Sequence, residues 1–289
     1  MSTTAQSAKN KVEQGANQVS HSTWVEWLAR IGYVARGILY IVVGVLAVQA
    51  ALGVGGGTTD KKGAIETIGA QPFGKFLLVL VAIGLAGYAL WGLVRALLDP
   101  LKRGTDPKGI AVRIGYLVSA FAYASLLFPT IAFIRGGGSS GTSQGSQDMT
   151  AALLSAPLGQ WLVVLVGVIG MIGGLGQLYQ AYSADFKKDL KTEEMSSREI
   201  DVATKFGRFG SAARGVIFIL LGFFVVQAAL QYDPKQAQGL DGALQTLAHQ
   251  PYGPVLLGIV ALGLVSFGIY SILCARWIKI TRQSTTDGK

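Results

Sequence analysis

Long apolar stretches alternate with short polar segments along most of the chain. Six of these stretches approach the length of about 20 residues that a helix needs to cross the hydrocarbon core of a bilayer. None of the six contains an aspartate or a glutamate. We therefore predict six membrane-spanning helices, at about residues 33–54, 76–98, 114–134, 160–181, 212–232 and 255–275.

The apolar pattern also repeats. The segment at 30–52, RIGYVARGILYIVVGVLAVQAAL, and the segment at 208–230, RFGSAARGVIFILLGFFVVQAAL, are identical at 12 of 23 positions. A weaker copy begins at Arg113 with RIGYLVSAFAYASLL. The chain therefore consists of three two-helix units between two polar tails. The predicted division is a cytoplasmic tail at 1–23, units at 24–99, 113–182 (divergent) and 200–277, and a cytoplasmic tail at 278–289.

A unit of two spans returns the chain to the side of the membrane that it left, so successive units share one orientation. Parallel repeats of this kind predict an all-α bundle of six spans with approximate three-fold symmetry. Small residues allow helices to approach closely within lipid. They recur on one helix face as Gly37 and Gly44 in the first unit and as Gly215 and Gly222 in the third, whereas the second unit has Ala120 and Leu127. The middle unit is therefore expected to pack differently.

Composition and charge support a membrane location. The chain is 51% hydrophobic and only 14% charged, whereas soluble domains carry roughly 25% charged residues. Its net charge of +9 would suggest nucleic-acid binding in a soluble protein. Here twenty of the 25 lysines and arginines lie on one side of the predicted spans. Positive charge marks the cytoplasmic side, which predicts a plasma (inner) membrane protein with both termini in the cytoplasm. The predicted partner is the bilayer with its anionic headgroups, not nucleic acid.

Two arginines stand within the leading edges of predicted spans. Arg36 in the first unit recurs as Arg214 in the third. An arginine near the end of a span can extend its guanidinium to the level of the lipid phosphates. We interpret both residues as anchors that fix the depth and orientation of their helices. The alternative is that they line a path for an anion or a neutral solute.

Other polar residues within the spans are candidates for the same path. Gln49 recurs as Gln227 near the outer ends of the first and fifth spans, and Gln177 lies in the fourth. The glutamines either cap helix ends or bind a solute. Arg95 shares a helix face with Tyr88 and Trp91, whereas the third unit has Cys274 at the matching position, without the charge.

The sequence offers little support for catalysis. Its two histidines and single cysteine form no nucleophile–base arrangement, and no metal-spaced cluster or phosphate-binding loop is present. We predict no catalytic residue, no cofactor and no metal, and the sequence identifies no protein partner. The leading hypothesis is a non-catalytic membrane protein with a structural or interaction role. The alternatives are passage of a small solute or ion along the repeat axis, and an intramembrane or lipid-modifying enzyme.

The repeated motifs resemble a known bacterial family. R-x-G-x-x-A-R-G, an apolar span that ends in Q-A-A-L, then G-A-[IL]-x-T-[IL] and Q-P-[FY]-G are similar to the "domain of unknown function 1206" family, from about Trp24 to Trp277. The second unit departs from this pattern, with Ser119 and Ala132 where the first has Arg36 and Gln49. The resemblance implies three tandem two-helix units and six spans, and it implies no activity.

Overall fold

The computed structural model describes residues 23–54, 58–59, 61–100, 104, 106–136 and 144–279. Most of the two predicted tails, residues 1–22 and 280–289, lies outside the described residues. Within them the chain is helical. The elements in chain order are α2 (Thr23–Leu52), α3 (Lys61–Gly69), α4 (Gly74–Leu98), α5 (Pro107–Ser125), α6 (Leu127–Ile134), α7 (Gln144–Leu154), α8 (Gly159–Ser183), η1 (Asp185–Asp189), α9 (Ser197–Leu230), η2 (Pro234–Gln236), α10 (Leu240–Ala248) and α11 (Gly253–Trp277).

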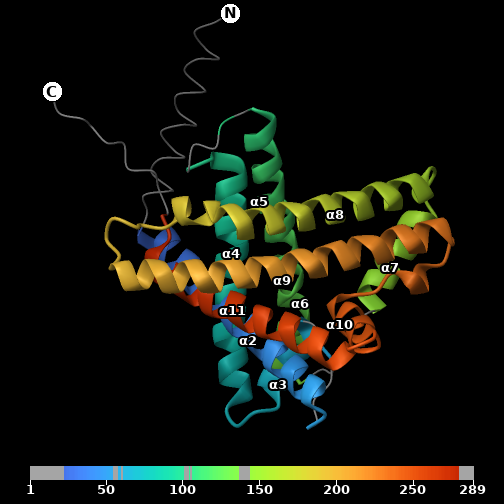
Figure 1. The fold of residues 1–289 in the computed structure, drawn as a ribbon, viewed down its shortest axis with the longest axis horizontal. Helices are drawn as coiled ribbons and strands as arrows, with labels where there is room; N and C mark the ends of the chain where they lie inside the picture. Colours follow the sequence, from blue (N-terminus) through green and yellow to red (C-terminus); the bar gives the residue numbers. More distant parts are fainter. Residues whose placement is uncertain are drawn as a thin grey trace, which may run out of the picture.

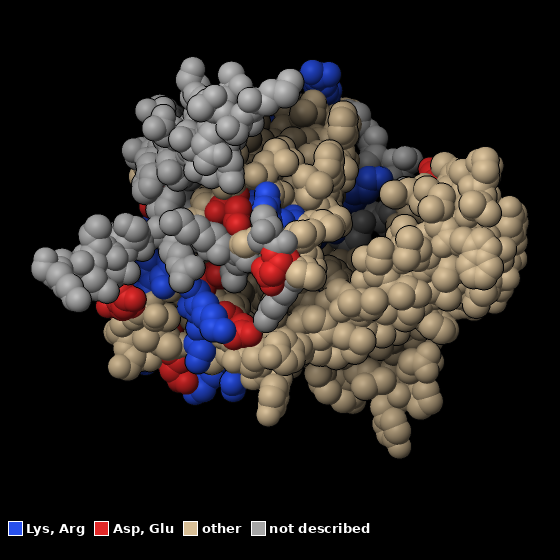
Figure 2. Space-filling model, turned by 90° about the horizontal axis from the view of Figure 1, so that it is seen from above, with Lys and Arg blue, Asp and Glu red and all other residues tan. Residues whose placement is uncertain are grey.

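Six helical segments are long and apolar enough to cross a membrane, as predicted. They are α2, α4, α5 together with α6, α8, α9 and α11. Most of the charged side chains visible in Figure 2 lie in one half of the view, and the opposite end of that face is largely uncharged. This distribution is the one expected of a multi-pass membrane protein, because charged groups are costly in hydrocarbon.

The third span is divided. Helix α5 ends at Ser125 and α6 begins at Leu127, although the sequence predicts one span over 114–134. Pro129 explains the interruption, because proline cannot donate the backbone hydrogen bond that would continue the helix at Ser125. At the same turn, the side-chain hydroxyl of Ser125 donates to the carbonyl oxygen of Ala122, at 2.9 Å.

The six spans form three tight pairs, α4 with the divided span α5 and α6, α2 with α11, and α8 with α9. Figure 1 shows that the pairs run in different directions, with α8 and α9 crossing α4 and α5 in this view. Each pair joins the second helix of one unit to the first helix of another. All three interfaces between units are therefore present, in the cyclic order that three-fold symmetry requires.

The interfaces within units are less regular. In the first unit α2 packs against α4, and in the third α9 packs against α11. No comparable packing joins α5 or α6 to α8 in the second unit. Only 17% of the apolar window in each of the two spans of the second unit is buried, against 56% for α2, α4 and α11. The cyclic order of the bundle is kept, but the ring is open within its middle unit.

The glycines predicted to bring helices together do so between units. A Cβ atom on Gly37 would lie 2.7 Å from the carbonyl oxygen of Gly268 in α11, and one on Gly215 would lie 2.9 Å from that of Gly174 in α8. Helix backbones at such distances have no room for a side chain, and close backbone contact is what holds helices together in lipid. The second unit has Ala120 at this position, facing Gly92.

The same elbow precedes the second span of every unit. Phe73, Leu158 and Tyr252 all have a left-handed backbone, with φ of 63°, 60° and 60°. All three side chains are highly exposed. The glycine that follows each of them packs directly on the backbone of the short helix before it. The elbow is therefore a property of the repeat that the divergent second unit keeps.

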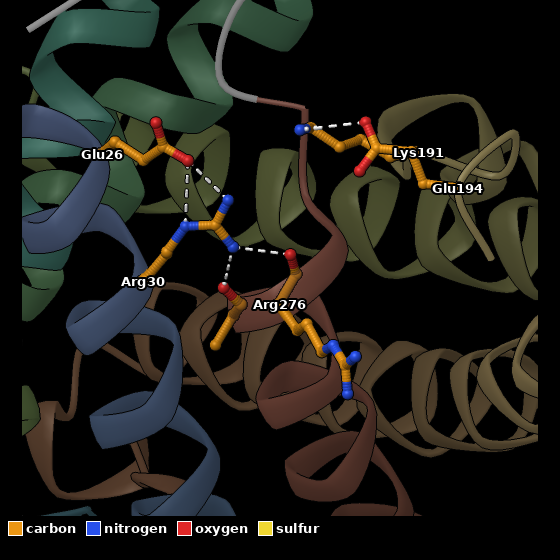
Figure 3. A network of polar contacts seen from close by, with 6 residues as sticks. Glu26, Arg30, Lys191, Glu194 and Arg276 are labelled. Carbon is orange, nitrogen blue, oxygen red and sulfur yellow. Dashed lines mark hydrogen bonds and ion pairs between the residues drawn. The ribbon is translucent and has the colours of Figure 1, made fainter. Parts of the chain in front are cut away.

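The end of the bundle where α2 begins and α11 ends is tied by polar contacts between these two spans (Figure 3). Arg30 forms an ion pair with Glu26 one turn earlier in α2, at 2.5 Å. Its Nη1 also donates to the carbonyl oxygens of Ala275 and Arg276 at the end of α11. Nearby, the backbone N–H of Lys191 donates to Trp277. These contacts satisfy carbonyls that a helix end leaves without partners.

Substitution of two glycines at matching positions tests whether the ring of spans is open within the second unit. A Cβ atom on Gly32 would lie 2.5 Å from the backbone nitrogen of Tyr88, whereas one on Gly115 in the second unit meets nothing within 4 Å. We expect Gly32→Ala to destabilise the protein by about 1–3 kcal/mol through overpacking. Gly115→Ala should stabilise it by about 0.5–1 kcal/mol through helix propensity.

The free energy of unfolding is measured in detergent from the reactivity of the buried thiol of Cys274, the single cysteine. Gly210→Ala in the third unit is the matched control, since its Cβ would also lie 2.5 Å from a backbone atom, Cα of Phe267. Equal destabilisation by the changes at Gly32 and Gly115 would show that the second unit is closed.

Candidate functional site

Arg36 is buried in the centre of the bundle, with 9% of its surface exposed. Its Nε donates to the hydroxyl of Ser271 in α11, at 2.9 Å, and its Nη1 donates to the hydroxyl of Tyr88 in α4. The guanidinium also lies about 5 Å from the ring centroids of Tyr33, Tyr88 and Phe267. The interpretation of Arg36 as a depth anchor is therefore wrong, because its side chain turns into the protein and not towards the lipid phosphates.

Arg95 is buried next to this network, with 7% of its surface exposed. Its Nη1 donates to the hydroxyl of Tyr33, at 3.2 Å. Its guanidinium lies 4.2 Å from the ring centroid of Tyr116 in α5. Arg95 therefore connects α4 to the first helices of two units, and Arg36 and Arg95 meet on the paired rings of Tyr33 and Tyr88, whose centroids are 5.3 Å apart.

The two buried arginines have no acidic partner. Arg36 and Arg95 are the only charged side chains in the buried set of the described residues, and that set contains no aspartate or glutamate. Arginine stays protonated in proteins. Hydrogen bonds from a charged group contribute about 1.5–3 kcal/mol each, and contacts with aromatic faces about 0.5–2 kcal/mol. Hydroxyl groups and aromatic rings thus stabilise the two charges, and the interior keeps its positive potential.

A cavity of about 170 Å³ lies beside this network. Its walls come from all three units, and two cationic side chains, Arg214 and Lys61, face it together with the ring of Tyr40. The guanidinium of Arg214 lies 4.2 Å from the ring centroid of Phe267. The lining residues are Tyr40, Lys61, Ala122, Leu126, Arg214, Ile217, Phe218, Leu221, Leu240 and Leu264.

Lys61 was missed by the sequence reasoning. It begins the short helix α3, and its Nζ lies 5.0 Å from the ring centroid of Tyr40 and 4.3 Å from that of Tyr123. The sequence places it in an outer loop, and its only available signal is that a lysine opens the loop helix of the first unit. Tyr40 and Tyr123 occupy matching positions in their repeats, which would have indicated a shared environment.

Arg214 differs from its counterpart Arg36. Arg36 uses its Nε to bond Ser271, and the position in α8 that matches Ser271 is Gln177. The Nε of Arg214 and the Oε1 of Gln177 are both buried, and neither has a hydrogen-bond partner among the described residues. Buried groups without partners are costly. The hydrogen bond from the arginine Nε is therefore formed between α2 and α11, and it is missing between α9 and α8, beside the cavity.

The remaining predicted polar residues stand apart from the cavity. Gln49 is exposed and Gln227 is half-buried. Neither lines the cavity. The structure thus brings Arg36 and Arg95 into one network and places Arg214 next to the cavity. It does not bring the two repeated glutamines into that site.

The cavity offers few groups for acid–base or metal chemistry. Among the described residues, its lining contains no histidine, cysteine or carboxylate. Elsewhere in the described part of the chain, no cluster of three or more histidine, cysteine, aspartate or glutamate side chains is placed to hold a metal ion. What the arrangement provides is positive charge in an aliphatic and aromatic setting.

Comparison with known proteins supports the repeat. Residues 31–99, 114–184 and 209–277 each match the family described as Domain of Unknown Function (DUF1206). The chain belongs to this family. It is also 37% identical over 250 residues to "Uncharacterized protein YxxB" of Bacillus subtilis (strain 168), which covers 86% of this chain and 90% of that protein. No solved structure matches it significantly. The three DUF1206 matches confirm three tandem units.

The hydrogen bonds of Arg36 lead to a prediction about the stability of the protein. Tyr88→Phe removes the hydroxyl that accepts from Arg36. The matching position in the third DUF1206 unit is Phe267, so the repeat accommodates a ring without a hydroxyl at this position. We expect a loss of about 1–3 kcal/mol in the free energy of unfolding, because one donor of a buried charged group loses its partner.

Thermal unfolding in detergent, followed by circular dichroism, measures this loss. Tyr182→Phe is the control, because Tyr182 is 85% exposed. Equal stability of the two variants would mean that the hydroxyl of Tyr88 contributes nothing to holding Arg36.

Proposed function

We propose that this protein is a non-catalytic, multi-pass protein of the plasma membrane, with both termini in the cytoplasm, and that it binds an anionic ligand in the cavity at Arg214 and Lys61. The observation that carries the proposal is the charge of the cavity. Two cationic side chains face it, and none of the lining residues that the structure describes is acidic. Binding sites recognise anions by placing such groups in a setting with little water.

The surroundings strengthen the positive potential. Arg36 shares the ring of Phe267 with Arg214, so a third cation lies close to the one at the cavity. The four ion pairs recorded among the described residues are at Arg30, Lys188, Lys191 and Lys205, and none involves a cation of the cavity. A bound anion would supply the negative charge that the described lining residues do not carry.

The same site argues against the two alternative functions. Catalysis is not favoured, since the cavity lining, as far as the chain is described, has no histidine, cysteine or carboxylate to transfer a proton or act as nucleophile. Passage along the repeat axis is not favoured either, because Gln49 and Gln227 do not line the cavity. The glycine contacts between units also bring the helices of the core together at backbone distance.

The proposed topology predicts the labelling of two engineered thiols. Lys235→Cys lies in η2, before α10, and Lys188→Cys lies in η1, between α8 and α9; both native side chains are exposed. A membrane-impermeant maleimide should label Lys235→Cys in intact cells, and Lys188→Cys only after permeabilisation. The wild type is the control, because Cys274 is buried. The reverse pattern would place the termini outside.

Anion binding predicts stabilisation by an added anion. Inorganic phosphate, titrated at constant ionic strength, should raise the unfolding temperature of the purified protein, because a ligand that binds only the folded state stabilises it. Arg214→Gln and Lys61→Gln should each weaken phosphate binding about tenfold or more, since each removes one charged contact of about 1.4 kcal/mol or more.

Lys205→Gln is the matched control for these variants. It removes a cation from the same helix as Arg214, but the side chain is 75% exposed and pairs with Asp201. Phosphate should stabilise this variant as much as the wild type. A phosphate effect that persists in Arg214→Gln and Lys61→Gln would locate the anion elsewhere and overturn the proposed site.

A further inference from the structure

The interface that is missing from the second unit can be followed residue by residue. On α2, Ala35 packs on Gly84 of α4 and Leu39 follows one turn later; both are buried, with 4% and 0% of their surfaces exposed, and the matching Ala213 and Ile217 on α9 are also buried, at 6% and 2%. The corresponding residues of α5 are Val118, which is 63% exposed, and Ala122, which is also exposed. The face of α5 that should meet α8 is therefore uncovered.

The opposite side of the gap is also uncovered. In α4, Tyr88 packs on Gly32 of α2 and Trp91 is buried, but α8 has Gly173 and Gly176 at the matching positions. A Cβ atom on either glycine would meet nothing within 4 Å. The nearby Ile169 is 57% exposed, where the first unit has the tightly packed Gly84. The aromatic side chains that close the first unit are thus absent from the second.

The gap is continuous with the cationic cavity. Ala122 belongs to the uncovered stripe of α5, and it also lines the cavity together with Leu126. On the other side, Phe218 and Leu221 of α9 line the cavity and are only partly buried. A ligand at Arg214 therefore has an apolar route to the side of the bundle, where lipid lies.

The cavity is small for a complete ligand. Its volume of about 170 Å³ compares with roughly 300–1,000 Å³ for sites that enclose drug-sized molecules. It therefore encloses only a small acidic group. The rest of a larger ligand has to extend along the gap, whose walls are formed by apolar side chains and glycine.

We propose that the ligand is a bilayer lipid with a small acidic headgroup, which enters sideways through the gap between α5 and α8. The headgroup binds at Arg214 and Lys61, and an acyl chain lies along Val118 and Ile169. This inference rests on the proposed anion binding and adds the class of ligand and its route. The cations match the headgroup, and the uncovered apolar faces match the chain.

Fluorescence quenching by labelled lipids tests this placement. A fluorophore is attached to Val118→Cys or Ile169→Cys, and to Leu80→Cys on α4 as the control; all three native side chains are exposed. The protein is reconstituted in phosphatidylcholine vesicles that contain a few mole per cent of phosphatidic acid with a nitroxide on its acyl chain. The comparison lipid is phosphatidylcholine with the same nitroxide.

At both gap positions, the acidic lipid should quench several-fold more strongly than its zwitterionic counterpart, and the effect should saturate. At Leu80→Cys the two lipids should quench alike. Adding Arg214→Gln and Lys61→Gln should abolish the preference at the gap, and adding Lys205→Gln should leave it intact. Equal quenching by both lipids at the gap, or a preference that survives Arg214→Gln, would overturn the inference.

The result is also distinguishable from failure of anion binding itself. If inorganic phosphate stabilises the wild type but not Arg214→Gln, and the acidic lipid shows no preference at the gap, then the lipid inference fails and the anion site stands. If phosphate has no specific effect and the lipid shows no preference, both proposals fail. Lipid preference at Leu80→Cys as strong as at the gap would indicate general attraction to the basic protein and would also overturn the inference.

Discussion

The packing of the bundle depends on the contacts that hold the positive charges of Arg36 and Arg95 in its interior without acidic partners. Arg36 and Arg95 are held by hydroxyl groups and aromatic faces contributed by α2, α4, α5 and α11, although the buried Nε of Arg95 has no hydrogen-bond partner among the described residues. The network therefore couples the packing of the first unit to that of the third. Because tyrosine and serine neutralise no charge, the interior stays positive, and the cavity at Arg214 and Lys61 inherits that potential.

The repeat explains why the cavity lies where it does. All three contacts between units are kept, and in two of them a glycine of one helix lies on a glycine carbonyl of the other, as Gly37 does on Gly268. The contacts within units require bulky side chains in the second helix, such as Tyr88 and Phe267. Helix α8 has Gly173 there, so the same architecture that closes the first and third units leaves the second unit open next to the cavity.

Much of the fold was accessible from the pattern of residues. Hydrophobic length predicted the six spans, because crossing hydrocarbon sets a minimum number of apolar residues. Identity between 30–52 and 208–230 predicted the repeat, and the lack of glycine at Ala120 and Leu127 correctly indicated that the middle unit packs differently. These properties are local or periodic, so each is visible in the order of the residues alone.

The site was less accessible, because side-chain direction depends on packing. Position along the helix suggested that Arg36 reaches the lipid phosphates, but only the arrival of Ser271 and Tyr88 from distant helices makes the interior the better place for it. The sequence places Lys61 in a loop, whereas in the folded protein its side chain lines the cavity. The sequence thus established the spans, their repetition and the residues that carry charge. The tertiary structure decided which charges meet, since partners far apart in the chain come together only when the helices pack.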